Sequence, residues 1–367
     1  SWPSIMPMGM TSLTPFRLRS DADDPRLARA IGTVAGVLAL PAVTIGAGIY
    51  SVPQDVARVF SSIPLVLGLW VAIGVYCLIG GLVWAELGTR LPYSGGAYLY
   101  MTKAFGPGVG FLFGWSSLLL TGPRNRAALA IVAADYIGVF VPLEPRSHQL
   151  VAAFMLVLTA GVNYVGVVWA SRFQSLSAVI KVVGLLALVV LVLAMAPVAD
   201  SGGTTGDIPA SDAPRGGVSA ALLHIFFCYR GWARLGYATG EMKNPRRDLP
   251  FAISVGLVAT MVIYVLINIL CFRALGVDGM RGSDVVVSDA AASFMGPSGY
   301  RVVAALIVIS IAGSLTVSIL AYSRLYFSMA KDGLLFRVFD AVHPVFATPH
   351  RAILIHLAMS LAMLLVY

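Results

Sequence analysis

Long apolar runs recur along the 367-residue chain and constrain its fold more than any other feature. A helix needs about 20 mostly apolar residues to cross a bilayer, and a spanning backbone in lipid must form helices or a closed barrel. With 58% hydrophobic and 11% charged residues, the composition lies outside the range of soluble domains. We therefore expect an all-α polytopic membrane protein. Nine predicted spans begin near Ile31, Pro64, Phe105, His148, Leu176, Val218, Phe251, Ser298 and Ala352.

The distribution of lysine and arginine predicts how the chain lies in the membrane. If the amino terminus is cytoplasmic, fourteen of these cations lie in cytoplasmic segments, six lie on the opposite side and five lie within spans. That bias follows the positive-inside rule. No compact apolar core precedes a small-residue cleavage site, so we expect residues 1–30 to be a cytoplasmic segment rather than a signal peptide. Residues 31–367 are expected to form one domain in the cell membrane.

The segment Thr44 to Pro53, TIGAGIYSVP, interrupts an otherwise apolar span with Gly46, Ala47 and Gly48. A backbone amide freed in hydrocarbon costs several kcal/mol, so a broken helix persists only where it is buried or lines a wet cavity. In transporters such breaks form the substrate site. The alternative is that the two glycines only allow close packing of helices.

Four blocks, in order along the chain, carry a family resemblance: IGAGIYSVP, WAELGTRLPYSGGAYLYMTKAFGPGVGFLFGW, RFQSLSAVIK and FFCYRGWARLGYATGEMKNPRRDLPFAI. Together they resemble the amino acid–polyamine–organocation (APC) transporters, in the branch of bacterial amino acid permeases and L-type transporters. The resemblance implies a LeuT-type fold with a 5+5 inverted repeat and broken helices 1 and 6. Members are similar in having twelve helices, so a chain with about nine is expected to be C-terminally incomplete. The second break is expected at Arg230 and Gly231, facing the first.

The resemblance also implies a site for a zwitterion between the two breaks. Helix amino termini present free N–H groups and a partial positive charge to a carboxylate. By resemblance, the amides around Ala47, Gly48 and Ile49 hold the carboxylate. The ammonium group is received by carbonyls near Thr44 and Ile45 and by those of Phe227, Cys228 and Arg230. Phe227 and Tyr229 are candidates for gating, although aromatic residues in helices are more often packing groups. The predicted substrate-binding residues are Thr44, Ile45, Gly46, Ala47, Gly48, Ile49, Phe227, Cys228, Tyr229, Arg230 and Gly231.

Lys181 closes the block RFQSLSAVIK within an apolar run. A lysine near a helix centre costs about 2.5–3.5 kcal/mol on insertion scales, so it is rarely there without a role. By resemblance its ammonium replaces the sodium ion of related carriers, touches the broken first helix, and can load and release a proton. The alternative is a side chain that snorkels to the cytoplasmic interface. Ser314, Thr316 and Ser318 are candidate contacts on the eighth helix, or polar groups that join helices.

Four arginines occupy positions where most relatives carry small or neutral residues: Arg124, Arg126, Arg230 and Arg234. One interpretation is a wet cavity for an acidic substrate, with Arg230 binding its side-chain carboxylate in a bidentate manner. The other is that these side chains snorkel, bond carbonyls freed at the break, or pair with groups that the sequence does not reveal. The sequence leaves both open.

These features predict a secondary carrier that moves amino acids by alternating access, through proton-coupled symport or exchange. Alternatives are an amino acid receptor that binds without transport, and a truncated carrier without function. No HExxH motif, paired carboxylates or nucleophile elbow suggests an enzyme, and no metal, cofactor or nucleic acid is expected. No cysteine is placed for a disulfide to an ancillary chain, so no obligatory protein partner is expected either.

Overall fold

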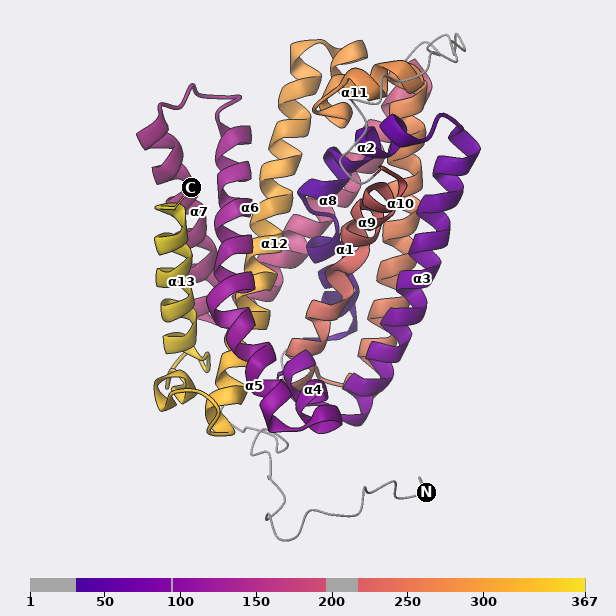
Figure 1. The fold of residues 1–367 in the computed structure, drawn as a ribbon. Coiled ribbons are helices and arrows are strands. Elements are labelled where there is room, and N and C mark those ends of the chain that lie inside the picture. The colour runs from indigo at the N-terminus through magenta and orange to yellow at the C-terminus, as the bar shows by residue number, and fades with distance from the viewer. Residues whose placement is uncertain (1–30, 94, 196–216, 367) are drawn as a thin grey trace.

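The structure, a computed structural model, describes residues 31–93, 95–195 and 217–366 and forms a bundle of helices (Figure 1). Five of its helices are long and apolar enough to cross a membrane. The other predicted spans are shorter or divided, so the count of nine spans stays a prediction. The five are α3 (Ile63–Arg90), α7 (Pro145–Val165), α8 (Val167–Met195), α10 (Pro245–Gly282) and α12 (Pro297–Lys331).

Three predicted spans are divided into shorter segments. The first comprises α1 (Thr33–Thr44), η2 (Ala47–Tyr50) and α2 (Val52–Val59). The third comprises α5 (Pro107–Ser116), a π-helical turn η3 (Ser117–Thr121) and α6 (Gly122–Ile137). The sixth comprises α9 (Gly217–Tyr229) and a 3-10 segment, η4 (Arg230–Glu241). Broken helices cross a membrane only where neighbouring protein covers the freed backbone groups.

Shorter helices complete the chain. They are α4 (Ala97–Phe105), α11 (Val286–Met295), η5 (Arg337–Asp340) and α13 (His350–Leu364). Gly95 and Gly96, with φ values of +126° and +49°, turn the chain into α4. This left-handed backbone suits glycine, which has no Cβ to clash.

The start of α8 differs from the sequence prediction. The helix begins at Val167 rather than near Leu176, directly after a turn at Gly166 with a φ of +141°. The polar residues between these positions, which end the apolar signal in the sequence, are therefore helical. As a result Lys181 lies in the middle of a long helix and not near its first turn.

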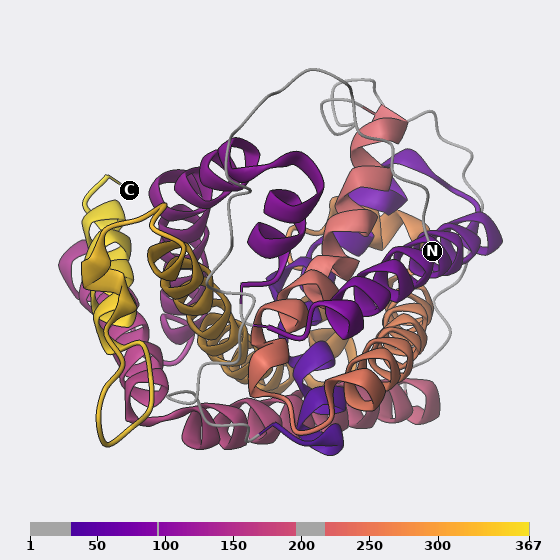
Figure 2. The ribbon, with the colours of Figure 1, turned by 90° about the horizontal axis from the view of Figure 1, so that it is seen from below.

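Seen from below, α6, α7, α12 and α13 form one group, and α3, α9 and α10 form another (Figure 2). The helix α1 packs on α10 of one group and on α12 of the other, and also on α8 and η4. Of the most apolar stretch of α12, 78% is buried, so α12 is a central element of the bundle. The two groups therefore meet around the divided first and sixth spans.

Two sets of polar contacts join elements at opposite ends of the bundle. At the lower end in Figure 1, Arg324 of α12 and Glu241 of η4 form an ion pair in which both side chains are buried. There Ile31 also exchanges backbone hydrogen bonds with Glu241 and Lys243. At the upper end, Arg58 of α2 donates to the carbonyls of Arg281 and Ser283 at the end of α10.

Candidate functional site at the two helix breaks

The first span is interrupted between Thr44 and Val52. After α1 ends at Thr44, Gly46 is extended with φ −103° and ψ −160°, and Ala47–Tyr50 form a 3-10 turn. Pro53 then lies in the first turn of α2, where its missing N–H is tolerated. A helix leaves its first amides without acceptors of its own, so the first two amides of the 3-10 turn are available to an anion. The predicted break is confirmed.

The sixth span unwinds at Arg230, as predicted. Its α-helical part ends at Tyr229, and the next twelve residues are a 3-10 segment. Such segments rarely exceed three or four residues, because their hydrogen-bond geometry is poorer than that of an α-helix. Gly231 lies in the first turn of the segment and Gly236 in its middle. A Cβ at Gly236 would lie 2.5 Å from Nε1 of Trp84, so η4 passes very close to α3.

The two breaks are in direct contact. A Cβ on Gly231 would lie 2.2 Å from Oγ1 and 2.7 Å from Cα of Thr44. A Cβ on Gly48 would lie 3.0 Å from Sγ of Cys228. Gly231 thus permits a separation from Thr44 that no larger residue would allow, and a side chain at Gly48 would crowd that of Cys228. The expectation that the breaks face each other is confirmed.

Tyr264, a residue that the sequence reasoning missed, joins the ends of both helices. Its hydroxyl lies 2.8 Å from the carbonyl oxygen of Thr44 and 3.0 Å from that of Cys228, and donates to this pair of acceptors. The side chain is fully buried and packs edge-on against Trp70. A tyrosine inside an apolar run carries no local signal of such a role, since only the fold brings α10 to the breaks.

Two of the carbonyls assigned to the ammonium group already accept two hydrogen bonds each in this conformation. The Thr44 carbonyl accepts from Tyr264 and from the amide of Gly46, and the Ile45 carbonyl accepts from Lys181 and Ser310. A carbonyl oxygen has two lone pairs, so neither is free for a ligand. The Thr44 hydroxyl, in contrast, is buried without a partner among the described residues.

Lys181 lies against the first break with no exposed surface. Its Nζ donates to the carbonyls of Ala42 and Ile45, both at 2.8 Å, and to that of Ser310 at 3.3 Å. An ammonium group has three donors, so all three are used by carbonyls of α1, the break and α12. This geometry excludes the snorkelling alternative and places Nζ against the first break, while the coupling role of Lys181 stays a prediction.

The candidates on the eighth helix separate into one that reaches the break and two that do not. Ser314 donates to the carbonyl of Ala42 at 3.2 Å. Thr316 donates to Ala312 in its own helix, and Ser318 is buried without a hydrogen bond to α1 among the described residues. Ser310, one turn before Ser314, was not predicted, yet it donates to the carbonyl of Ile45 at 2.5 Å.

The remaining predicted residues differ in their burial and in their contacts at the breaks. Ile49 and Tyr229 are buried, and the Tyr229 hydroxyl donates to the carbonyl of Trp70. Phe227 is 54% exposed, and the guanidinium of Arg230 lies over its ring at 5.2 Å. A cation above an aromatic face is attracted to it. The backbone of Arg230 therefore lies at the break, while its side chain is engaged with Phe227.

Arg126 lies away from the breaks, at the junction of α6 with α13. It is 1% exposed and donates to Oγ of Ser360 and to the carbonyl of His356. Its Nη1 has no partner among the described residues. Arg126 therefore fits the interpretation in which arginines bond polar groups inside the bundle, whereas Arg124, two residues earlier, is exposed.

Comparison with protein-family models matches residues 28–367 to the family described as "Amino acid permease". The chain belongs to this family. The match includes both breaks and Lys181, and it confirms the resemblance found from the four sequence blocks.

Curated relatives of this permease include the b(0,+)-type amino acid transporter 1 of Oryctolagus cuniculus, 28% identical across 95% of this chain and 74% of the relative. The serine/threonine exchanger SteT of Bacillus subtilis is 28% identical across 94% of this chain and 78% of its own. The large neutral amino acids transporter small subunit 2 of Homo sapiens is 32% identical across 92% of this chain and 64% of its own.

Among solved structures, the permease is similar to MhsT in complex with L-phenylalanine. The TM-score is 0.61 at 16% sequence identity, over 90% of this chain and 78% of MhsT. At that identity the likeness concerns the fold alone. It confirms the predicted fold class, an all-α LeuT-type transporter fold.

Proposed function

We propose that the chain is a secondary carrier that moves amino acids across the cell membrane by alternating access between the two helix breaks. The contact of Gly231 with Thr44, and of Gly48 with Cys228, is the observation that carries the proposal. It brings a helix start with free amides beside a helix end with carbonyls, which together match the two charges of a zwitterion. The names of the relatives, all amino acid transporters or exchangers, support the same substrate class.

Within this site the substrate carboxylate binds the amides of Ala47 and Gly48. The ammonium group binds carbonyls of the sixth span, from Phe227 to Arg230, and the free hydroxyl of Thr44. The saturated carbonyls of Thr44 and Ile45 support this narrower assignment.

Lys181 couples the first break to α8 and α12. Its three hydrogen bonds hold the end of α1 against α12 while the ammonium is charged. Loss of a proton leaves the nitrogen with two N–H donors, so one of the three carbonyls is released. This provides a route from protonation to movement of α1, and supports proton-coupled symport; exchange of one amino acid for another is the other mode that the site allows.

The test is uptake of a labelled amino acid panel into proteoliposomes, with and without an imposed pH gradient or an internal amino acid. Stimulation by the gradient indicates symport, and stimulation by internal substrate indicates exchange. Lys181→Ala should abolish the gradient effect, whereas Lys243→Ala, which removes an exposed lysine, should retain it. Saturable binding without any uptake would instead identify a receptor. Glutamate in the panel tests the acidic-substrate hypothesis for Arg230.

The prediction that the carrier needs no protein partner stays a prediction, since one relative is described as a small subunit. The three cysteines are free and buried, which leaves them unsuited to an exposed disulfide with a second chain. Purification without a stoichiometric second subunit, in a form active in proteoliposomes, would support the prediction.

A further inference from the structure

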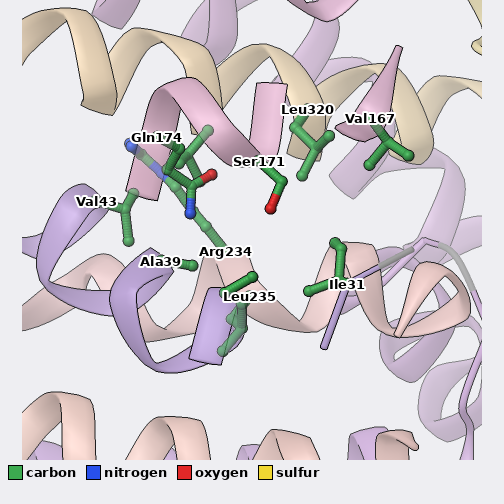
Figure 3. A pocket seen from close by; sticks show the side chains of 11 residues that line it. Ile31, Ala39, Val43, Val167, Ser171, Gln174, Arg234, Leu235 and Leu320 are labelled. Atoms are coloured by element: carbon green, nitrogen blue, oxygen red, sulfur yellow. The ribbon is translucent and has the colours of Figure 1, made fainter. Parts of the chain in front are cut away.

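A cleft opens directly below the helix breaks, between α1, α8, η4 and α12 (Figure 3). Its walls are mostly apolar, with Ala39 and Val43 of α1 on one side and Leu320 of α12 on the other. Ile31 lies at one end of the cleft, and Val43, the residue before Thr44, lies at the other. The cleft therefore runs from the first break toward the lower end of the bundle.

Polar groups gather at the end of the cleft that is next to the break. The side chain of Arg234 extends toward Gln174 of α8, and Ser171 lies one turn away on the same helix (Figure 3). None of the three side chains has a hydrogen bond to another described residue. Gln174 is also only 6% exposed, so its amide is nearly enclosed by the walls of the cleft.

Arg234 has no compensating negative charge among the described residues. The acidic residue nearest in sequence, Glu241, is engaged in the buried ion pair with Arg324. Arg234 is only partly buried, so a ligand that enters the cleft can reach its guanidinium. A guanidinium with all five donors free matches a carboxylate, which accepts two parallel hydrogen bonds from it.

We propose that this cleft is a second substrate subsite, in which Arg234 binds the carboxylate of an amino acid on its way between the helix breaks and the lower face. Gln174 and Ser171 bind the remaining polar atoms, and Ala39, Val43 and Leu320 contact the apolar part of the substrate. The cleft has a volume of about 20 Å³ in this conformation, room for about one water molecule, so the subsite forms as α1 or η4 moves and the cleft widens. The subsite rests on the proposed transport function. It adds a step in which the carboxylate passes from backbone amides to a side chain three residues beyond Gly231.

The experiment compares apparent KM values measured from each face of the membrane, in proteoliposomes with a single orientation of the protein. Arg234→Gln should raise the KM at the lower face by about tenfold or more, because a hydrogen bond between charged groups is lost. The KM at the upper face should stay within about twofold of the wild type, because entry from that side reaches the breaks first. The KM of Arg234→Lys at the lower face should lie between those of Arg234→Gln and the wild type. Lysine keeps the charge but lacks the planar guanidinium that donates two parallel hydrogen bonds to a carboxylate.

Arg172→Gln is the matched control. Arg172 carries the same charge on α8, but its guanidinium lies over the ring of Trp169 and does not line the cleft. This variant should leave both KM values unchanged. If Arg234→Gln does not fold, Gln174→Leu supplies the second test, with the same increase confined to the lower face.

An equal change at both faces, or no change at either, would overturn the subsite. Failure of the proposed function has a different signature, because the wild-type protein would then transport no amino acid in the panel, whether or not it binds one. The two hypotheses can therefore fail separately.

Discussion

At the scale of single residues, the contact between the breaks depends on one hydroxyl group and on two missing side chains. The Tyr264 hydroxyl is shared between one carbonyl of the first span and one of the sixth. Gly231 allows the two backbones to approach to a separation that any side chain would increase, and Gly48 leaves room for the side chain of Cys228. The two features are tested by different substitutions. The hydrogen bonds of Tyr264 can be removed without changing the packing, whereas a side chain added at Gly231 forces the two backbones apart.

We expect Tyr264→Phe to reduce uptake by about tenfold and to lower the stability of the protein by about 1–3 kcal/mol. Phenylalanine fills the same volume, but two buried carbonyls lose their shared donor, at a cost of about 1–3 kcal/mol. Uptake in proteoliposomes and thermal unfolding in detergent measure the two effects. Tyr326→Phe is the control, because it also removes a buried hydroxyl bonded to a carbonyl, that of Ser117, away from the breaks. Equal transport defects in both variants would show that Tyr264 has no special role.

We expect Gly231→Ala to abolish substrate binding. The added Cβ would lie 2.7 Å from Cα and 2.8 Å from the amide nitrogen of Thr44, so backbone rather than a flexible side chain must move. Gly161→Ala is the control, since nothing lies within 4 Å of its added Cβ on α7. There alanine should stabilise the helix by about 0.5–1 kcal/mol. Binding by Gly231→Ala at wild-type affinity would contradict the close contact.

At the scale of elements, the sequence predicted features that are encoded locally. The two breaks, at Gly46 to Gly48 and at Arg230 and Gly231, were found because glycines interrupt apolar runs there. Lys181 was found because a lysine in an apolar run is costly. Both signals are visible within a window of about one helical turn or two, and neither depends on a partner elsewhere in the chain.

Features that depend on partners could not be predicted in the same way. Ser310 and Tyr264 look like ordinary residues of apolar helices, and only the packing of α10 and α12 against α1 gives them their acceptors. Arg324 lies at the end of an apolar run, and nothing in the sequence marks Glu241, 83 residues away, as its buried partner. The start of α8 was missed because polar residues between Gly166 and Leu176 end the apolar run without ending the helix.

The ion pair of Arg324 with Glu241 makes a prediction for the contact between η4 and α12. Neutralising one partner, as in Glu241→Gln or Arg324→Gln, should destabilise the protein by about 3–5 kcal/mol, because the other charge stays buried. The double variant Glu241→Gln/Arg324→Gln should be more stable than either single variant, since no lone charge remains. Thermal unfolding of the three variants measures this difference. Simple additivity of the two single effects would show that the pair is not coupled.

At the scale of the whole molecule, the two sets of end contacts limit how the bundle can move. The lower set joins η4 to α12 and to Ile31, and the upper set joins α2 to the end of α10. A carrier that alternates must open one end at a time, so the two sets should break in different states. The cleft beside Arg234 ends near Ile31, which places its exit behind the lower set.

The charge distribution predicts the orientation of the molecule in the membrane, and labelling can test that prediction directly. The positive-inside rule places the lower end in the cytoplasm, so a cysteine at Lys103 in α4 should lie inside and one at Arg146 at the start of α7 outside. Both positions are exposed. In whole cells, an impermeant maleimide should therefore label Arg146→Cys, whereas Lys103→Cys should react only after the membrane is permeabilised. The native cysteines are buried and should give a low background. Labelling of Lys103→Cys in intact cells, without labelling of Arg146→Cys, would reverse the orientation and move the Arg234 subsite to the external path.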